Sequence, residues 1–410
     1  MNRKIQEIVN YAYKNVQYYI NRNDFSGSVH TDKDWKNIPI LTKNDVIMNQ
    51  DSFISNLSIV KYINNQLRIE HTSGSTGKCL EVLWEESDYQ RSLLPLYFRR
   101  MQYHGIHPDD KLCFFYTVRS KEKEDVEFVE KNQTLAFSKS NLNSKKMLEI
   151  YGKMKRFEPV WILGQPSILL LLADAIVENE LEPILSIKYI ELTGEMLFPE
   201  MRKRIEEVFK CQIANHYGTI EVSSIAYECP CGNLHLTDST YTEIVDSEGN
   251  VLNDGEEGEV CVTSLVNKAM PFIRYNIGDR AIINSNHECG CGSSNKILKL
   301  TRGRVNDYIS TSTGECINSY IFVRAIEIVN YMYPQAIKQF QIVQNDYFRF
   351  RVKFVLDKDY NFQEICELFL NSIWQSELKQ AVYDFEIVDA LFPNDNGKLA
   401  YFTNNIKDGV

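Results

Sequence analysis

A dense run of small hydroxyl residues and glycines that ends in a lysine is the first feature of the sequence able to do chemistry. The run is Thr72-Ser73-Gly74-Ser75-Thr76-Gly77-Lys78, and it follows a strand-like segment, 67–70. Glycines let a backbone wrap around a phosphate group, hydroxyls donate hydrogen bonds to it, and lysine adds positive charge. A Walker A loop is excluded, because Thr72 stands where that motif has glycine and Cys79 where it has serine or threonine. We predict a phosphate-binding loop; the alternative is an ordinary polar turn.

Two cysteine pairs form the second chemical feature. They are Cys229-Pro230-Cys231-Gly232 and Cys289-Gly290-Cys291-Gly292, and His235 follows the first pair. Paired thiolates in turns that end in glycine are how cysteines converge on tetrahedral Zn²⁺. Only four of these five side chains can bind one ion, and the four cysteines are the simplest set. We predict a structural zinc site, since no activating glutamate is suggested; the alternative is four free thiols on loops.

Composition limits the classes of protein that this chain could be. It has 410 residues and a net charge of −10, from 45 Lys and Arg against 55 Asp and Glu. An acidic balance disfavours binding to nucleic acid, which needs clustered basic residues. The apolar run 166–177 is too short for a membrane span, and the first twenty residues lack the apolar stretch of a signal peptide. We expect a cytoplasmic protein with reduced cysteines and no membrane contact.

The order of expected elements predicts an α/β fold. Strand-like runs alternate with amphipathic helices from about residue 60 to 300, which favours a largely parallel sheet with ligands at the carboxyl ends of its strands. Short strands and turns dominate after about 240, and a strand-turn-helix series follows Gly303. We therefore predict a large N-terminal body with mixed sheets flanked by helices, over 1–303, with a β-rich part at about 225–300. A small α+β domain would span 304–410.

Six motifs, in order along residues 35–402, resemble those of the adenylate-forming superfamily of acyl-CoA synthetases, adenylation domains and luciferases. They are the loop Ser73-Gly74-Ser75-Thr76-Gly77-Lys78, Thr193-Gly194-Glu195, Asn215-His216-Tyr217-Gly218-Thr219-Ile220-Glu221, Arg274-Tyr275-Asn276-Ile277-Gly278-Asp279, Leu300-Thr301-Arg302-Gly303-Arg304 and Pro393 to Lys398. The segment 38–43, Ile-Pro-Ile-Leu-Thr-Lys, and the cysteine pairs resemble the phenylacetate-CoA ligase branch, which also holds coenzyme F390 synthetase-like and CapK-like proteins.

The resemblance implies activation of a carboxylic acid by ATP and Mg²⁺ through an acyl-adenylate. By that resemblance, the loop 73–78 would hold the β- and γ-phosphates and Glu221 would ligate Mg²⁺. Asp279 would accept the ribose hydroxyls, and Arg304 would lie near ribose and phosphate. Lys398 would bridge the carboxylate and the α-phosphate when a mobile C-terminal domain closes. The remaining residues with an implied nucleotide contact are Gly194, Glu195, Asn215, His216, Tyr217, Gly218 and Thr219.

The resemblance does not decide which molecule accepts the acyl group. Phenylacetate-CoA ligases imply an aryl or arylacetic acid and CoA as the acceptor, whereas CapK-like proteins imply an amine, hydroxyl or carrier-protein acceptor without CoA. A third alternative is a nucleotide-binding protein without catalysis. Relatives also imply a homodimer and a zinc set of Cys229, His235, Cys289 and Cys291.

Two positions depart from the family pattern. Ile220 stands where the family has Thr or Ser, and its methyl groups cannot donate to a phosphate, so either Thr219 substitutes or the loop is shifted. Asn306 stands at the hinge aspartate, followed by Asp307. Because the phosphate and magnesium residues are intact, we expect an active enzyme.

Overall fold

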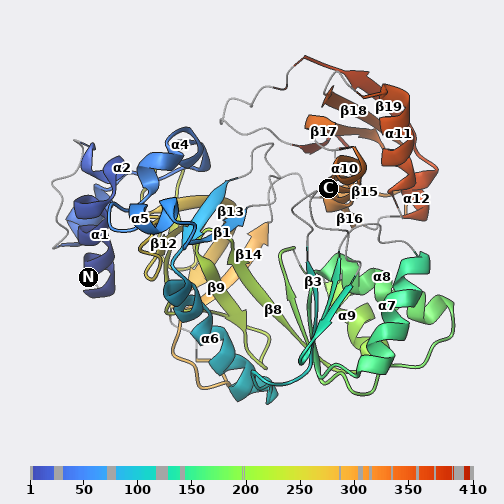
Figure 1. Ribbon diagram of the computed structural model, residues 1–410, viewed down its shortest axis with the longest axis horizontal. Helices are drawn as coiled ribbons and strands as arrows, with labels where there is room; N and C mark the ends of the chain where they lie inside the picture. Colours follow the sequence, from blue (N-terminus) through green and yellow to red (C-terminus); the bar gives the residue numbers. More distant parts are fainter. Residues whose placement is uncertain are drawn as a thin grey trace.

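The computed structural model describes residues 3–22, 31–71, 80–116, 128–138, 144–195, 197, 199–285, 288–302, 308–313, 316–333, 336–356, 360–373, 375–389, 391 and 401–406. The N-terminal part of this chain is built around one twelve-stranded sheet, with strand order β11-β12-β13-β14-β10-β9-β8-β7-β6-β3-β5-β4 (Figure 1). The strands that alternate with helices and the short antiparallel strands thus belong to one sheet.

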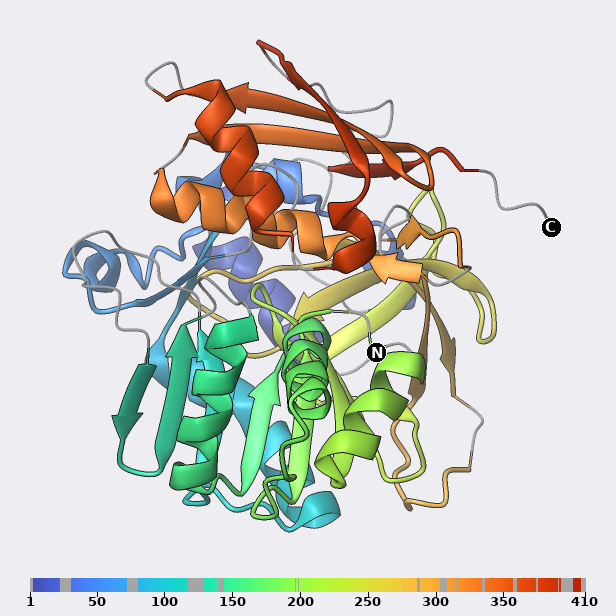
Figure 2. The same ribbon diagram turned by 90° about the vertical axis from the view of Figure 1, so that its right-hand side faces the viewer.

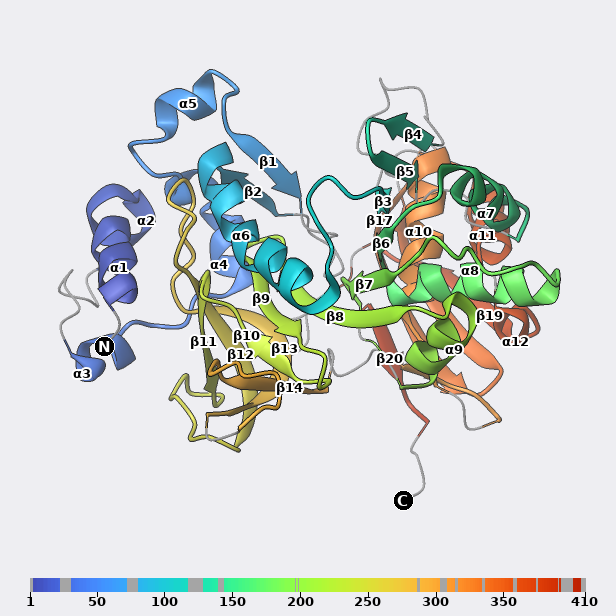
Figure 3. The same ribbon diagram turned by 90° about the horizontal axis from the view of Figure 1, so that it is seen from below.

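The α/β half of the sheet is parallel, as the alternating pattern predicts. Its strands are β3 (Leu112–Tyr116), β5 (Thr134–Ser138), β6 (Trp161–Gly164), β7 (Tyr189–Thr193) and β8 (Gln212–Thr219), with β4 (Phe128–Lys131) antiparallel at the edge. Helices α7 (Ser144–Phe157), α8 (Pro166–Glu178) and α9 (Pro199–Phe209) pack on one face through a shared apolar core. Helix α6 (Glu86–His104) covers the other face (Figure 3).

The second half of the sheet is antiparallel, so the prediction of a largely parallel sheet holds only for the first half. It contains β9 (Ser223–Glu228), β10 (Leu234–Leu236), β11 (Thr240–Val245), β12 (Glu257–Ser264), β13 (Tyr275–Asn284) and β14 (Ile297–Arg302). Turns and loops join its successive strands without the crossover helix that a parallel pair would need; the turn with Gly249, at φ +85°, lies in the connection between β11 and β12. Apolar residues of β9, β12 and β13 meet in one core, so this half of the sheet is strongly curved.

The N-terminal segments pack on the curved half of the sheet and share its core. They are α1 (Arg3–Asn15), α2 (Gln17–Ile20), α3 (Asp32–Lys36), α4 (Lys43–Met48), a 3₁₀ helix (Gln50–Phe53), α5 (Ile59–Ile63) and the hairpin β1 (Arg68–His71) with β2 (Glu81–Trp84). None of the helices in the described part of the chain is long and apolar enough to cross a membrane.

The C-terminal residues form a separate unit that has a four-stranded sheet, a two-stranded sheet and an aromatic core of its own. Its elements are β15 (Tyr308–Ser310), β16 (Cys316–Asn318), α10 (Tyr320–Met332), β17 (Ile337–Asp346), β18 (Arg349–Leu356), α11 (Phe362–Asn371), α12 (Ser376–Lys379), β19 (Val382–Ile387) and β20 (Phe402–Asn404). Figure 2 shows this unit over the carboxyl ends of the parallel strands. The boundary predicted at 303 falls in 303–307, outside the described residues, and stays a prediction.

Candidate functional site

The hairpin of β8 and β9 carries the predicted magnesium ligand in its turn. β8 ends at Thr219 and β9 begins at Ser223, so Glu221 lies in the turn 220–222, where it is buried. Gly218 is required by a close approach of the two strands, because a Cβ on Gly218 would lie 2.3 Å from the carbonyl oxygen of Ser223. The register of the two strands shifts at this glycine. The motif glycine therefore sets the shape of the turn that presents Glu221.

The family departure at Ile220 is visible in this turn. Ile220 is exposed, whereas the hydroxyl of Thr219 is buried and has no hydrogen-bond partner among the described residues. A buried hydroxyl without a partner is costly, and a ligand oxygen would satisfy it. Of the two alternatives, this geometry favours substitution by Thr219, whose hydroxyl is the donor that Ile220 lacks.

A bulge in β13 presents the predicted ribose ligand, Asp279. Gly278 has φ +86°, a conformation that favours glycine, and its N–H donates to the side chain of Asn276 at 2.8 Å. The pairing of β12 with β13 shifts register between Glu259 and Cys261. Asp279 lies within this irregularity, directly after Gly278, which explains why glycine precedes the aspartate in the motif.

Two tyrosine–carboxylate hydrogen bonds cross between the hairpin and β13. The hydroxyl of Tyr217 donates to Asp279 Oδ2 at 2.8 Å, and the hydroxyl of Tyr275 donates to Glu221 Oε1 at 2.9 Å. Each carboxylate thus accepts from a tyrosine on the other element. The structure therefore brings together two motifs that are more than fifty residues apart in the sequence.

The end of β7 places a third motif beside β8. Thr193 pairs with His216, and Gly194 follows at φ +84° with the side chain of Gln165 packed against it. Glu195 follows immediately in the chain. Gln165 lies at the carboxyl end of β6 and makes no capping hydrogen bond to α8. Sequence reasoning missed it, although its position directly after a strand was a signal.

A buried charged network lies behind this edge of the sheet, and sequence reasoning missed it too. Arg100 of α6 donates two hydrogen bonds of 2.6 Å to Glu191 of β7, and both side chains are buried. His216 Nδ1 lies 3.3 Å from Glu191 Oε1. Burial alone would raise the pKa of Glu191, but the Arg100 guanidinium and the contact with His216 hold that pKa well below the usual carboxyl range. The network ties α6 to the two strands that carry nucleotide motifs.

Several predicted residues cannot be placed in this site. The loop residues Ser73, Gly74, Ser75, Thr76, Gly77 and Lys78, together with Arg304 and Lys398, lie outside the described residues. Their implied contacts with phosphate and ribose stay predictions.

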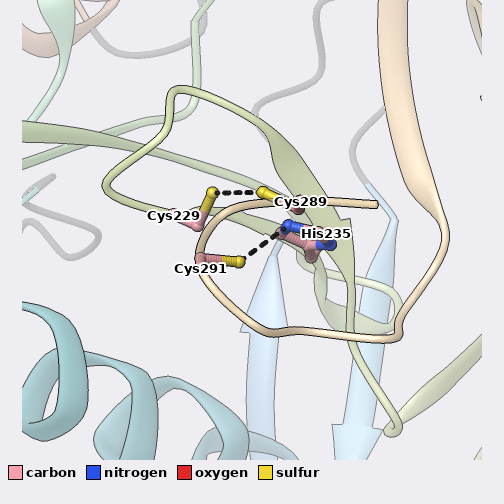
Figure 4. Close-up of side chains that lie close together, drawn as sticks. All are labelled: Cys229, His235, Cys289 and Cys291. Carbon is pink, nitrogen blue, oxygen red and sulfur yellow. Dashed lines mark hydrogen bonds between the residues drawn. The ribbon is translucent and has the colours of Figure 1, made fainter. Parts of the chain in front are cut away.

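A second candidate site joins four of the five predicted zinc ligands. One ligand atom each from Cys229, His235, Cys289 and Cys291 lies within 4.8 Å of all the others (Figure 4). The sulfurs of Cys229 and Cys289 are 3.6 Å apart, and Cys291 Sγ is 3.3 Å from His235 Nε2. Cys231 is exposed and is not part of this cluster.

The surroundings of the cluster orient its members. His235 Nδ1 lies 2.8 Å from the carbonyl oxygen of Asn295, so Nδ1 carries the proton and Nε2 is left as an acceptor toward the sulfurs. Hydrogen bonds from the backbone of Cys291 and the side chain of Asn233 lower the pKa of the Cys289 thiol to about 5. A metal ion requires an Nε2 acceptor and deprotonated cysteines. Burial acts in the opposite direction on Cys229 and raises its pKa to about 12, so the shifts alone do not favour an ion.

Comparison with known proteins adds to this geometry. Residues 132–266 match the family model for AMP-binding enzyme, and residues 309–405 match the model for the CapK C-terminal domain. Protein CapK of Staphylococcus aureus is 25% identical over 99% of this chain and 89% of its own length. Phenylacetate-coenzyme A ligase of Escherichia coli (strain K12) is 28% identical over 68% of this chain and 65% of its own length.

A solved structure shows the same fold. That structure is 2-hydroxyisobutyryl-CoA ligase in complex with 2-HIB-AMP and CoA, with a TM-score of 0.64 and 19% identity over 98% of this chain and 88% of that one. The predicted α/β fold and the predicted class of enzyme, an adenylate-forming ligase, are therefore confirmed. The resemblance predicted from the sequence, to the adenylate-forming superfamily and to its branch with the phenylacetate-CoA ligases and CapK, is confirmed by these matches.

Proposed function

We propose that the protein activates a carboxylic acid with ATP. The carboxylate attacks the α-phosphorus of ATP, which forms an acyl-adenylate and releases pyrophosphate. The observation that carries this proposal is the crossed pair of hydrogen bonds, Tyr217 to Asp279 and Tyr275 to Glu221, since it assembles the implied ribose and magnesium ligands at one place.

The chain's own residues have complementary tasks in this reaction. Glu221 has a second carboxylate oxygen with no hydrogen-bond partner among the described residues, and a hard cation such as Mg²⁺ prefers such an oxygen. Asp279 accepts from the ribose hydroxyls. The loop 73–78, Arg304 and Lys398 supply the positive charge that two anionic reactants require. Mg²⁺, when bound, offsets the charge of the phosphates.

The acyl group then passes to CoA, with an aryl or arylacetic acid as the favoured substrate. Support comes from four phenylacetate-coenzyme A ligases at 26–28% identity. The thiol of CoA attacks the acyl carbon, a thioester forms, and AMP leaves. The C-terminal unit, over 304–410, would reorient between these two steps.

A second acceptor is favoured by a specific observation. The CapK match spans 99% of this chain, and its C-terminal domain model covers 309–405, whereas the Escherichia coli ligase aligns with 68% of the chain. In this alternative an amine, hydroxyl or carrier-protein thiol attacks the adenylate, and CoA takes no part.

We also propose that Cys229, His235, Cys289 and Cys291 hold one structural zinc ion. A tetrahedral ion with Zn–S bonds of about 2.3 Å places its ligand atoms roughly 3.5–4 Å apart, close to the separations of 3.6 and 3.3 Å in this cluster. Cys229 follows β9 at the end opposite the turn with Glu221, roughly 25 Å away along the strand. The ion would therefore pin β9, β10 and the loop before β14 without touching the reactants.

Two further predictions accompany this function. Reduced thiols, ATP and CoA favour the cytoplasm. A homodimer stays a prediction from the resemblance.

Exchange of labelled pyrophosphate into ATP tests the proposal across a panel of aryl, arylacetic and aliphatic acids. We expect exchange that depends on one class of acid and on Mg²⁺, and its absence with every acid favours a protein without catalysis. Product analysis with CoA then separates the acceptors: a thioester supports CoA, and exchange without a thioester supports the CapK-like alternative. Lys398→Ala should abolish exchange while ATP binding persists; unchanged exchange contradicts the role of Lys398.

A further inference from the structure

The segment 38–42, which the proposed reaction does not use, runs against the start of β13. Leu41 brackets Tyr275: its N–H donates to the carbonyl of Arg274 at 2.8 Å, and its carbonyl accepts from the N–H of Asn276 at 2.9 Å. Thr42 then begins α4 with a capping box to Asp45, which fixes where the segment ends. The backbone of Tyr275 is therefore held from the N-terminal side.

The side chain of Arg274 fixes the start of β13 through a second set of hydrogen bonds. The residue is 1% exposed, and its side chain donates to the carbonyl oxygens of Ile38 at 2.6 Å and Gly249 at 2.9 Å. Its φ of +49° is rare for a residue with a side chain and persists only where the surroundings fix it. Arg274 thereby joins the N-terminal segment, the turn at Gly249 and β13 next to Tyr275.

The side chain of Tyr275 connects this fixed backbone to Glu221 in the candidate site. The residue is 1% exposed, its ring packs edge-on against Phe272, and its hydroxyl donates to Glu221 Oε1 at 2.9 Å. Glu221 lies in a turn, where a carboxylate without a partner could rotate. Because a fixed donor holds one carboxylate oxygen of Glu221, the other oxygen points in a defined direction.

We infer that Tyr275 is a positioning residue, which orients Glu221 toward the divalent cation, and that segment 38–42 acts with Arg274 to hold Tyr275 in place. The inference rests on the proposed function, since it assumes that Glu221 binds the cation of ATP. It gives the N-terminal segment a role in catalysis at a distance, through hydrogen bonds to β13.

Tyr275→Phe tests this inference, because it removes only the hydroxyl. Mn²⁺ serves as the probe: binding of Mn²⁺ with ATP to the full chain, without acid, is followed by electron paramagnetic resonance of the free ion. We expect the Mn²⁺ affinity to fall at least about 10-fold, as is typical when the partner of a metal ligand is lost. The Mg²⁺ concentration for half-maximal pyrophosphate exchange should rise by a similar factor, with the maximal rate little changed.

Tyr19→Phe is the matched control. Tyr19 is a buried tyrosine of the same core, and its hydroxyl bonds to Pro271 and Ile273 at 3.0 and 3.1 Å, away from Glu221. This variant should lower the melting temperature and leave the Mn²⁺ affinity unchanged. Arg274→Lys should weaken Mn²⁺ binding, with no further loss when it is combined with Tyr275→Phe.

The outcomes separate the inference from the function beneath it. Wild-type exchange together with unchanged Mn²⁺ affinity in Tyr275→Phe overturns the inference alone. Equal losses of Mn²⁺ affinity in Tyr275→Phe and Tyr19→Phe also overturn it, since the effect is then one of core stability. A wild-type chain that binds no Mn²⁺ with ATP and shows no exchange overturns both.

Discussion

Tyr217 of β8 donates a 2.8 Å hydrogen bond to Asp279 of β13, although three strands, β14, β10 and β9, separate these two in the sheet. The contact is possible because the sheet curves until its antiparallel half faces β8. Tyr275, four residues before Asp279, returns a hydrogen bond to Glu221, four residues after Tyr217. The curvature of the sheet is thus what assembles the candidate site.

Tyr217→Phe should weaken binding of ATP. A hydrogen bond to a charged group contributes about 1.5–3 kcal/mol, so loss of this one should weaken the support of Asp279, the proposed ribose ligand. We expect the KM for ATP in pyrophosphate exchange to rise about 10-fold, with a smaller fall in kcat. An unchanged KM for ATP would show that Asp279 needs no support from Tyr217.

Gly218→Ala should damage both the hairpin and the reaction. The added Cβ would lie 2.3 Å from the backbone oxygen of Ser223, so the strands must move apart beside Glu221. Overpacking of this kind costs about 1–3 kcal/mol, and we expect at least a 10-fold loss of exchange.

Gly152→Ala is the control for that substitution. Gly152 lies in α7, and nothing lies within 4 Å of the added Cβ. Alanine is the better helix former, so this variant should be more stable by about 0.5–1 kcal/mol and fully active. Thermal unfolding and exchange are measured on both variants; full activity in Gly218→Ala would show that the turn tolerates a wider separation.

Zinc content should depend on Cys289 and not on Cys231. Cys289 belongs to the cluster of four, whereas Cys231 is exposed and lies outside it. Elemental analysis should find about one zinc per chain in the wild type and in Cys231→Ser, and much less in Cys289→Ser. We also expect the melting temperature to fall in Cys289→Ser and after treatment with a chelator. Loss of zinc in Cys231→Ser, with His235→Ala retaining it, would establish the four-cysteine set instead.

Glu191→Gln should destabilise the fold in a manner that depends on pH. The folded pKa of Glu191 is depressed, so its pairing with Arg100 contributes fully above the ordinary carboxyl pKa of about 4.3 and is lost as the pH falls further. Breaking one partner of a buried pair costs about 3–5 kcal/mol. The difference in unfolding temperature from the wild type should therefore be largest at pH 6–8 and narrow below about pH 4.

The control for this pair is Glu7→Gln. Glu7 forms an exposed ion pair with Arg3 at 2.8 Å, and such pairs contribute little. Its unfolding temperature should match the wild type at every pH. A constant difference for Glu191→Gln across the pH range would mean that shape, not charge, is what Glu191 supplies.

The local sequence pattern predicted individual helices and strands better than it predicted the tertiary contacts between them. Apolar residues in the sequence predict helices over 320–332 and 167–179, and the structure has them as α10 and, within one residue at each end, as α8. The sequence also predicts a single helix over 361–379, but α11 ends at Asn371 and α12 begins at Ser376. Ile373, between the two, is buried in the core of the C-terminal unit, a tertiary contact that helical periodicity does not indicate.

The candidate site shows the same difference: its motifs can be found in the sequence, but its tertiary contacts cannot. Motifs named Glu221 and Asp279, yet nothing local indicates that Tyr275 and Tyr217 bond to them across the sheet. Arg100 and Glu191 are 91 residues apart, and each resembles an ordinary surface charge in the sequence. Spacing in the sequence names five candidate zinc ligands but cannot choose four of them, because the choice depends on which way each turn points; the cluster of four in the structure favours the set without Cys231.

Transfer of oxygen from the acid to AMP tests the central claim most directly. The acid that supports exchange is labelled with ¹⁸O in both carboxyl oxygens, and the products of one complete turnover with ATP and acceptor are examined by mass spectrometry. Formation of an acyl-adenylate predicts one ¹⁸O in AMP, because the carboxylate oxygen that attacks the α-phosphorus leaves with it. Formation of ADP, with the label in inorganic phosphate, would contradict the account.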